Sequence, residues 1–449
     1  MSGSRQGIWY SFTPMARFDI EPKLIIERAE GNRLIDREGT EYIDGVASLW
    51  AIVHGHGHPH IVEAIKRQAE KLQHSTLLGI GHIPAEELTE RLLPHLPRGL
   101  TRVFYSSDGA SAVEVALKMA LQYWVNVGRP QRTRFAAMDM GYHGDTLGAT
   151  SVGGGGSFRK AYQSALFEPL RFANPYALRC RACSGSKNCD LACTDSLEQL
   201  LEQNAEDVAA VIVEPRVQGA AGMIVAPEGH LRRIADLCRH HDVLLIADEV
   251  ATGFGKTGAM FACDLEGVSP DIMVLGKGIS GGYLPLSATV ATDRVYEAFY
   301  DANDYSKTLF HGHTYGGNPI ACAAALASLD IFEREPVLER VDQRAATLDK
   351  MLTAIVADHP LVVDVRRQGL MVGIEIVSGG ASNAELTPSG EAAWKACLKA
   401  RELGVFVRPL GDTIVVMPPL SIEESEIKQI CEAVRYGIES VAGSAAGVG

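Results

Sequence analysis

A chain of 449 residues, 46% of them hydrophobic, can bury a large core, and we expect one large and one small domain. A formal net charge of −13 without a lysine or arginine block excludes a nucleic-acid partner, because this charge repels a phosphate backbone. No basic start precedes an apolar stretch, and no apolar run approaches the length of a membrane span. We therefore predict a cytoplasmic protein that binds small molecules and no membrane.

The first segment, residues 1–75, contains "RLIDREGTEYIDG", which predicts a hairpin that turns at Glu38 to Thr40. We expect this segment to pack with a small domain formed by the end of the chain.

Residues 76–332 alternate short apolar runs with helical patterns, and several runs are apolar throughout, as strands buried on both faces must be. This order predicts the α/β class, with a mostly parallel sheet covered on both faces. Expected helices begin near Ser111 and Gly229, and the expected strands begin at Arg102, Arg134, Val208, Val243, Asp271 and Leu286. Residues 333–449 change to a pattern of strands followed by a last helix, which predicts a smaller α+β domain.

Ligands of open α/β sheets bind beyond the carboxyl ends of the strands. After the first run, "SDGASAVEVAL" turns at Gly109 and Ala110 into a helix, whose free N–H groups could hold a phosphate. Of the later runs, "VLLIAD" ends at Asp248, and "DIMVLG" ends at Gly276, directly before Lys277. A lysine there is costly unless it is paired, neutralised or used covalently. Pyridoxal phosphate requires such a lysine, an acid for its ring nitrogen and a phosphate cup, and Tyr142 offers an aromatic face for the ring.

Five motifs in one order carry a resemblance over nearly the whole chain: "SSDGASAVEVALKMALQYW", "GYHGDT", "IADEVATGFGKTG", "LGKGISGGYLPL" and "HGHTYGGNPIACAAALA". They resemble the class III aminotransferases of pyridoxal-phosphate fold type I. The resemblance implies a large domain with a mostly parallel seven-stranded sheet, a smaller α+β domain and a homodimer. "WYSFTPM", "HSTLLG", "VQGAAGMIV" and "VRPLGDTIVVMPPL" resemble the members that aminate 8-amino-7-oxononanoate to 7,8-diaminononanoate in biotin synthesis.

The resemblance also implies roles at the cofactor. Lys277 would form the Schiff base and move the proton between the substrate Cα and the cofactor C4′, and Asp248 would pair with the pyridine nitrogen. Tyr142 and Val250 would lie on either side of the cofactor ring, and Gly109 and Ala110 would hold its phosphate. Glu214 would be a nearby carboxylate, and Thr314 would reach the phosphate from the neighbouring subunit.

For the substrate, the resemblance places Arg408 at the distal carboxylate of the acceptor, while Phe12, Trp50 and Tyr142 would line its channel. Lys256 stands where the family usually has arginine, so the amino donor stays open between S-adenosylmethionine, lysine and another diamine. One alternative is a broad ω-amine or diamine transaminase that uses pyruvate or 2-oxoglutarate. Another is a non-catalytic metal-cluster sensor or scaffold, against which the set of Lys277, Asp248 and Tyr142 argues.

Two further motifs suggest metal chemistry. The run "HGHGHPH", His54 to His60, has no carboxylate or cysteine nearby in sequence, and we interpret it as turn and pocket lining. The stretch "CRACSGSKNCDLAC", in a predicted insertion over residues 178–195, departs from the family pattern. Its four thiols fit a [4Fe-4S] cluster, structural zinc, or disulfides and idle thiols, and we favour a structural metal centre, iron–sulfur before zinc, at Cys180, Cys183, Cys189 and Cys193.

Overall fold

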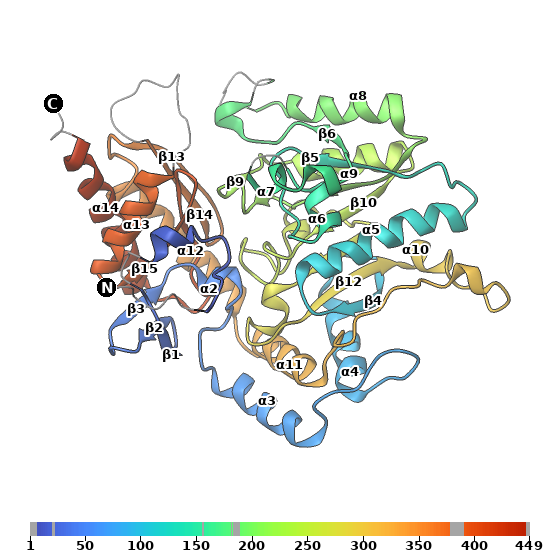
Figure 1. Cartoon of the computed structure of the whole chain (residues 1–449), viewed down its shortest axis with the longest axis horizontal. Coiled ribbons are helices and arrows are strands. Elements are labelled where there is room, and N and C mark those ends of the chain that lie inside the picture. Colours follow the sequence, from blue (N-terminus) through green and yellow to red (C-terminus); the bar gives the residue numbers. More distant parts are fainter. Residues whose placement is uncertain are drawn as a thin grey trace.

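The computed structural model describes residues 7–19, 23–154, 157–180, 182, 189–377 and 390–445. The large sheet and its helices occupy one side of the molecule, and the elements near both ends of the chain lie together on the other (Figure 1). No helix among the described residues combines the length and apolar character needed to cross a membrane.

The large sheet has seven strands, and only β12 among them runs antiparallel to its neighbours. The prediction of a mostly parallel seven-stranded sheet is therefore confirmed. One strand, β6, was not predicted, because three residues are too few to show a pattern. In sheet order the strands are β4 (Leu100–Ser106), β12 (Ser287–Thr292), β11 (Ile272–Leu275), β10 (Leu244–Asp248), β7 (Val208–Val213), β5 (Arg134–Met138) and β6 (Leu170–Phe172).

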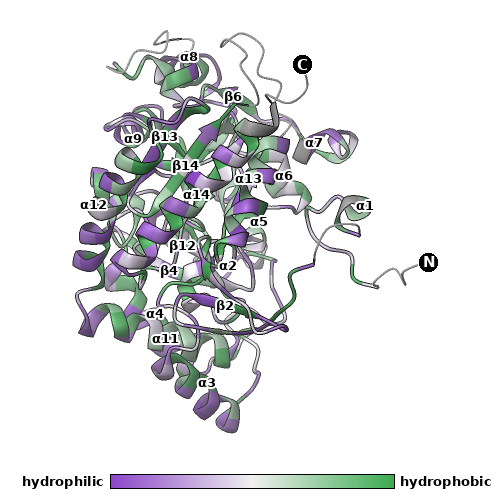
Figure 2. Ribbon diagram, turned by 90° about the vertical axis from the view of Figure 1, so that its left-hand side faces the viewer, coloured by the Kyte–Doolittle hydropathy of each residue, from purple (hydrophilic) through white to green (hydrophobic). Residues whose placement is uncertain are grey.

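Alternate residues of the central strands enter two separate apolar cores. In β7, Val211 and Val213 belong to one core, whereas Ala210 and Ile212 belong to the other. Successive side chains of a strand point to opposite faces, so a strand with a core on each side must be apolar throughout. Helices such as α5 (Gly109–Asn126) and α9 (His230–His240) close these cores. Hydrophilic and hydrophobic residues alternate along the outer helices of the molecule (Figure 2).

The chain's two ends share a second body. Strands β1 (Ile26–Glu30), β2 (Arg33–Asp36) and β3 (Glu41–Asp44) form a sheet in which β3 pairs in parallel with β15 (Val405–Phe406). The predicted turn lies between β2 and β3, where Gly39 has a φ of 84°. A second sheet and its covering helices complete this body: β13 (Val362–Gln368), β14 (Met371–Ile376), β17 (Thr413–Val416), β16 (Arg408–Leu410), α13 (Glu391–Glu402) and α14 (Glu424–Ala445).

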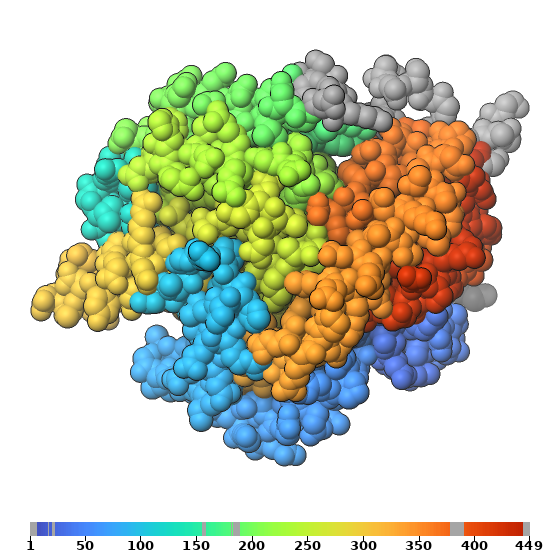
Figure 3. All heavy atoms as spheres, turned by 180° about the vertical axis from the view of Figure 1, so that it is seen from behind, coloured from blue at the N-terminus to red at the C-terminus, as the bar shows by residue number. Residues whose placement is uncertain are grey.

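Two long helices connect the two bodies. Helix α11 (Pro319–Arg334) packs against α3 (Pro59–Lys71) and α4 (Ile83–Leu92), and α12 (Val337–Ile355) packs against α14. From behind, this orange segment crosses the molecule beside the light-blue N-terminal helices (Figure 3). The remaining helices and strands are short: α1 (Met15–Phe18), α2 (Ala47–Trp50), α6 (Leu147–Val152), α7 (Ser157–Lys160), α8 (Asp195–Asn204), α10 (Asp293–Glu297), β8 (Val217–Gln218) and β9 (Ile224–Val225).

Candidate active site

A cavity of about 490 Å³ opens at the carboxyl ends of the parallel strands. Its walls come from the segments that follow β4, β5, β7, β10 and β11, together with α2. Eight residues predicted from the sequence for the cofactor or substrate lie in this wall: Trp50, Gly109, Ala110, Tyr142, Glu214, Asp248, Val250 and Lys277.

Lys277 follows β11 after Gly276 and has a left-handed backbone, with a φ of 42°. Burial lowers the pKa of its amine, although the nearby Asp248 and Glu214 carboxylates oppose this change. Its Nζ lies 5.1 Å from the centre of the Trp50 ring. A lowered pKa increases the fraction of neutral amine, which can attack a carbonyl or accept a proton.

Asp248 ends β10 and lies within the buried floor of the cavity. Its Oδ1 accepts a hydrogen bond from the Val250 amide at 3.0 Å, and its Oδ2 lies 2.7 Å from Nδ1 of His143. An ionised carboxylate can only accept, so Nδ1 of His143 donates in this pair. Two donors therefore orient a carboxylate that faces the cavity.

Tyr142 is held by its backbone as well as by its hydroxyl. Its amide donates to Oε1 of Glu214 at 2.9 Å, the Gly219 amide donates to Oε2 at 2.9 Å, and the tyrosine hydroxyl donates to Asp145 at 2.8 Å. Burial raises the pKa of Glu214 to about 7, even though His143 and the two amides favour its ionised form. Glu214 thus fixes the loop that carries the ring of Tyr142.

The start of α5 forms one end of the cavity, where a phosphate was predicted. Asp108 caps this helix by accepting hydrogen bonds from the amide and hydroxyl of Ser111, at 2.9 and 2.7 Å. The preceding amides, of Gly109 and Ala110, belong to the first turn, where a helix supplies no carbonyl acceptors. A side chain at Gly109 would come within 2.8 Å of Val250 Cγ1, so only glycine permits this close approach.

These residues fit pyridoxal phosphate. The cavity presents a lysine with a depressed pKa, a carboxylate oriented by two donors, an aromatic ring on a fixed loop and a helix N-terminus that favours an anion. The family model for class-III aminotransferases matches residues 15–437. The chain belongs to the class-III aminotransferases. They are pyridoxal-phosphate enzymes, and the predicted family, fold type I and cofactor are thereby confirmed.

Individual relatives support this assignment over the whole chain. The adenosylmethionine-8-amino-7-oxononanoate aminotransferase of Nitratidesulfovibrio vulgaris is 49% identical over 436 residues, which cover 97% of this chain and 80% of the relative. A crystal structure of the protein of that name from Methanocaldococcus jannaschii has a TM-score of 0.91 and 43% identity, with 97% of both chains covered. An amine transaminase from an uncultivated Pseudomonas species, solved in its pyridoxal-phosphate-bound form, has a TM-score of 0.92 and 36% identity, with coverages of 97% and 99%.

Three predicted site residues lie outside the cavity wall of the described chain: Phe12, Thr314 and Arg408. Phe12 is 61% exposed, and Thr314 is exposed as well. Arg408 lies in β16 between Phe406 and Leu410, both of which pack against the apolar cluster that contains Trp50. Their roles stay predictions.

The sequence analysis missed His143. Its ring is buried, it binds Asp248, and its Nε2 has no hydrogen-bond partner among the described residues. The two residues are 105 positions apart, and no pattern in the sequence joins them. The one available signal was its place directly after Tyr142, in the loop at the end of β5.

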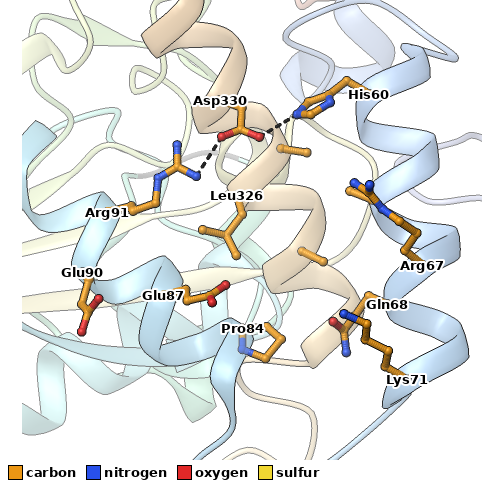
Figure 4. Close-up of a pocket in the computed structure, with 13 residues that line it drawn as sticks. His60, Arg67, Gln68, Lys71, Pro84, Glu87, Glu90, Arg91, Leu326 and Asp330 are labelled. Atoms are coloured by element: carbon orange, nitrogen blue, oxygen red, sulfur yellow. Dashed lines mark hydrogen bonds and ion pairs between the residues drawn. The ribbon is translucent and has the colours of Figure 1, made fainter.

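The histidine run has protein partners. Nε2 of His54 contacts Ser328 at 3.0 Å, and Nε2 of His56 contacts Asp44 at 2.9 Å. His60 lies at a separate cavity of about 610 Å³ between α3, α4 and α11, where its ring contacts Asp330 at 2.6 Å (Figure 4).

Cys183 lies outside the described residues, so the predicted four-cysteine site can be followed only in part. Cys180 and Cys193 are buried, and Cys189 accepts a hydrogen bond from the Leu191 amide at 3.4 Å. Burial, followed by the nearby Cys189 and Cys180, raises the pKa of Cys193 to about 12. Within the described ranges, no group of three or more histidine, cysteine or acidic side chains is placed to hold a metal ion.

Proposed function

We propose that this aminotransferase converts 8-amino-7-oxononanoate to 7,8-diaminononanoate, with S-adenosylmethionine as the first donor to test. The observation that carries the proposal is the guanidinium of Arg408. It is half-buried, burial lowers its pKa, and it makes no hydrogen bond or ion pair with any described residue. An unpaired buried cation favours an anionic ligand, and a guanidinium binds a carboxylate with two parallel hydrogen bonds.

The surroundings of Arg408 suit the apolar chain of this acceptor. Phe406 and Leu410 flank Arg408 in sequence and pack with Trp50, Met371 and Met417. This cluster extends from the strand that carries the cation to the wall of the cofactor cavity. The names of the relatives from N. vulgaris and M. jannaschii supply the specific acceptor and donor.

When bound, pyridoxal phosphate supplies an electron sink for the carbon that carries the transferred amine. The Asp248 carboxylate would hold a proton on the ring nitrogen, and the ring of Tyr142 and the side chain of Val250 would fix the cofactor plane from either side. Lys277 Nζ, as a neutral amine, would take the proton from the amine-bearing carbon and return it one position away. One water would release the donor as a carbonyl compound while its amino group is retained at the site. The acceptor would then receive this amino group by the reverse sequence, which returns the water.

The test compares 8-amino-7-oxononanoate with its methyl ester, which lacks the negative charge. Loss of a charge-assisted hydrogen bond costs about 1.5–3 kcal/mol, so Arg408→Ala should raise KM for the acid about 10- to 100-fold. It should leave KM for the ester within about threefold. Arg408→Lys should recover part of the loss, because an ammonium keeps the charge without the bidentate geometry.

Two outcomes would contradict the proposal. One is an equal effect of Arg408→Ala on acid and ester. The other is failure of the wild-type gene to complement a biotin auxotroph blocked at this step, together with rapid transfer from simple amines to pyruvate.

We also propose a homodimer in which Thr314 reaches the phosphate of the partner's cofactor. Thr314 is exposed and lies on the loop of residues 310–318. This loop contacts the loop of residues 73–83, because the Asn318 side chain donates a hydrogen bond of 2.9 Å to the Gln73 carbonyl. Both loops carry exposed apolar side chains, including Leu78 at 83% and Phe310 at 61%. Adjacent exposed apolar groups favour a protein interface.

We also propose a structural metal at the cysteine loop. Its support is the proximity of Cys180 and Cys189 to the buried Cys193 thiol.

A further inference from the structure

Residues Ala47–Trp50 form α2 as a single left-handed turn. Their φ angles are 48°, 46°, 70° and 66°, although none of the four is glycine. Side chains clash with the backbone in this region, so an isolated Ala-Ser-Leu-Trp segment would adopt a right-handed or extended conformation. Surrounding contacts must therefore hold the turn in place.

The first contact is at the start of the turn. Asp44 is fully buried, and its Oδ1 accepts hydrogen bonds from the amides of Val46 and Ser48, at 3.4 and 3.0 Å. Its Oδ2 accepts from the Ser48 hydroxyl at 2.8 Å and contacts Nε2 of His56 at 2.9 Å. This carboxylate fixes the first half of the turn but makes no contact with Trp50.

The second contact is at the end of the turn. Nζ of Lys256 donates a hydrogen bond to the Trp50 carbonyl, and the lysine side chain is only 2% exposed. No other hydrogen bond of this amine exists within the described part of the chain. This hydrogen bond fixes the orientation of the Trp50 peptide group, because any rotation of that group would leave the buried amine without an acceptor.

The turn determines where the indole of Trp50 lies. That ring is 5.1 Å from Lys277 Nζ, and a side chain added at Gly219 would meet it at 3.3 Å. Trp50 therefore lies between the lysine and the Gly219 loop, in the wall of the cofactor cavity.

We propose that Lys256 is a positioning residue that holds the left-handed turn Ala47–Trp50 and thereby sets the indole of Trp50 against Lys277. Lys256 contacts neither the substrate nor the cofactor in this assignment. Its effect on the reaction passes through Trp50. The inference uses the family's aminotransferase activity and is independent of the acceptor proposed above.

A double-mutant cycle tests this route. Lys256→Met keeps the length of the side chain and removes the donor, and we expect kcat/KM for a small primary amine to fall about tenfold. In a Trp50→Ala background, the same substitution should change kcat/KM less than about twofold, because the ring that it positions is absent. Equal losses in both backgrounds would overturn the proposal and give Lys256 a direct role.

Hydrogen exchange of the cofactor-free protein provides a readout independent of activity. The amides of Trp50, Ala51 and Ile52 bond to Val46 and Ala47 within the turn, and Lys256→Met should increase their exchange at least about tenfold. Lys350→Met, an exposed lysine on α12, is the matched control and should leave these rates unchanged. Unchanged rates in Lys256→Met would overturn the proposal.

Lys256→Arg provides a second variant should Lys256→Met not fold. Arginine retains an N–H donor for the Trp50 carbonyl, so the exchange rates and kcat/KM should stay within about threefold of wild type. A loss as large as that of the methionine variant would contradict the role of the hydrogen bond.

Discussion

His143 contacts Asp248, the residue that we propose pairs with the ring nitrogen of the cofactor. Asp248 is surrounded by apolar strand residues, and a buried carboxylate without donors prefers its neutral form. The imidazole supplies one of the two donors to this carboxylate, at 2.7 Å, and the Val250 amide supplies the other. Removal of the imidazole should therefore leave Asp248 less well oriented and weaken the cofactor contact proposed for it.

We predict that His143→Phe increases the pyridoxal-phosphate dissociation constant about 10- to 100-fold, from the 1.5–3 kcal/mol of a hydrogen bond to a charged group. The visible absorbance of the bound cofactor, titrated in equilibrium dialysis, measures this constant. His143→Asn retains an amide donor and should recover part of the affinity. A phenylalanine variant that binds the cofactor as tightly as wild type would refute the role of His143.

Single residues at strand ends could be predicted from the sequence, whereas contacts between loops could not. Asp248 and Lys277 each follow an apolar run, and parallel strands bring such positions to one edge. His143 sits in a loop whose course depends on Glu214 and Gly219, so its contact with Asp248 follows only from tertiary structure.

At the scale of the elements, α2 has a left-handed backbone conformation that its own sequence disfavours. Each non-glycine residue in this conformation costs about 1–2 kcal/mol, and "ASLW" itself contains neither the asparagine nor the glycine that usually marks it. The turn exists because Asp44 and Lys256 hold it from outside. By contrast, β7 is apolar throughout and β10 is apolar up to its last residue, Asp248, and their sequences alone were sufficient to predict them.

The cysteine loop is the element whose chemistry elemental analysis can decide. We predict about four irons with sulfide per chain in anaerobically purified protein, while a single zinc would support the alternative centre. Cys189→Ser should remove the metal and lower the melting temperature, because metal binding contributes folding energy. Cys431→Ser, a buried cysteine on α14 away from the loop, is the control and should retain the metal. Wild-type protein with neither metal rejects both centres.

At the scale of the whole molecule, we propose that a second copy of the chain completes the cofactor cavity. Thr314 is predicted to contact the phosphate of a partner chain's cofactor. It belongs to the loop of residues 310–318, which contacts the loop of residues 73–83, and both loops carry exposed apolar side chains. A dimer that buries these loops would complete the cavity and remove apolar surface from water in the same step.

We therefore predict that light scattering gives about twice the chain mass of 48.3 kDa, and that Leu78→Asp shifts the protein to the monomer. Position 78 is 83% exposed in the single chain, and a dimer formed through this loop would bury the new carboxylate without a partner. The monomer should also release its cofactor, since Thr314 can then no longer reach the partner's phosphate. Leu403→Asp places the same charge on an exposed leucine after α13 and should change neither mass nor cofactor content. A Leu78→Asp protein that remains dimeric would exclude this loop from the interface, and a monomer that keeps its cofactor would show that the site is complete in one chain.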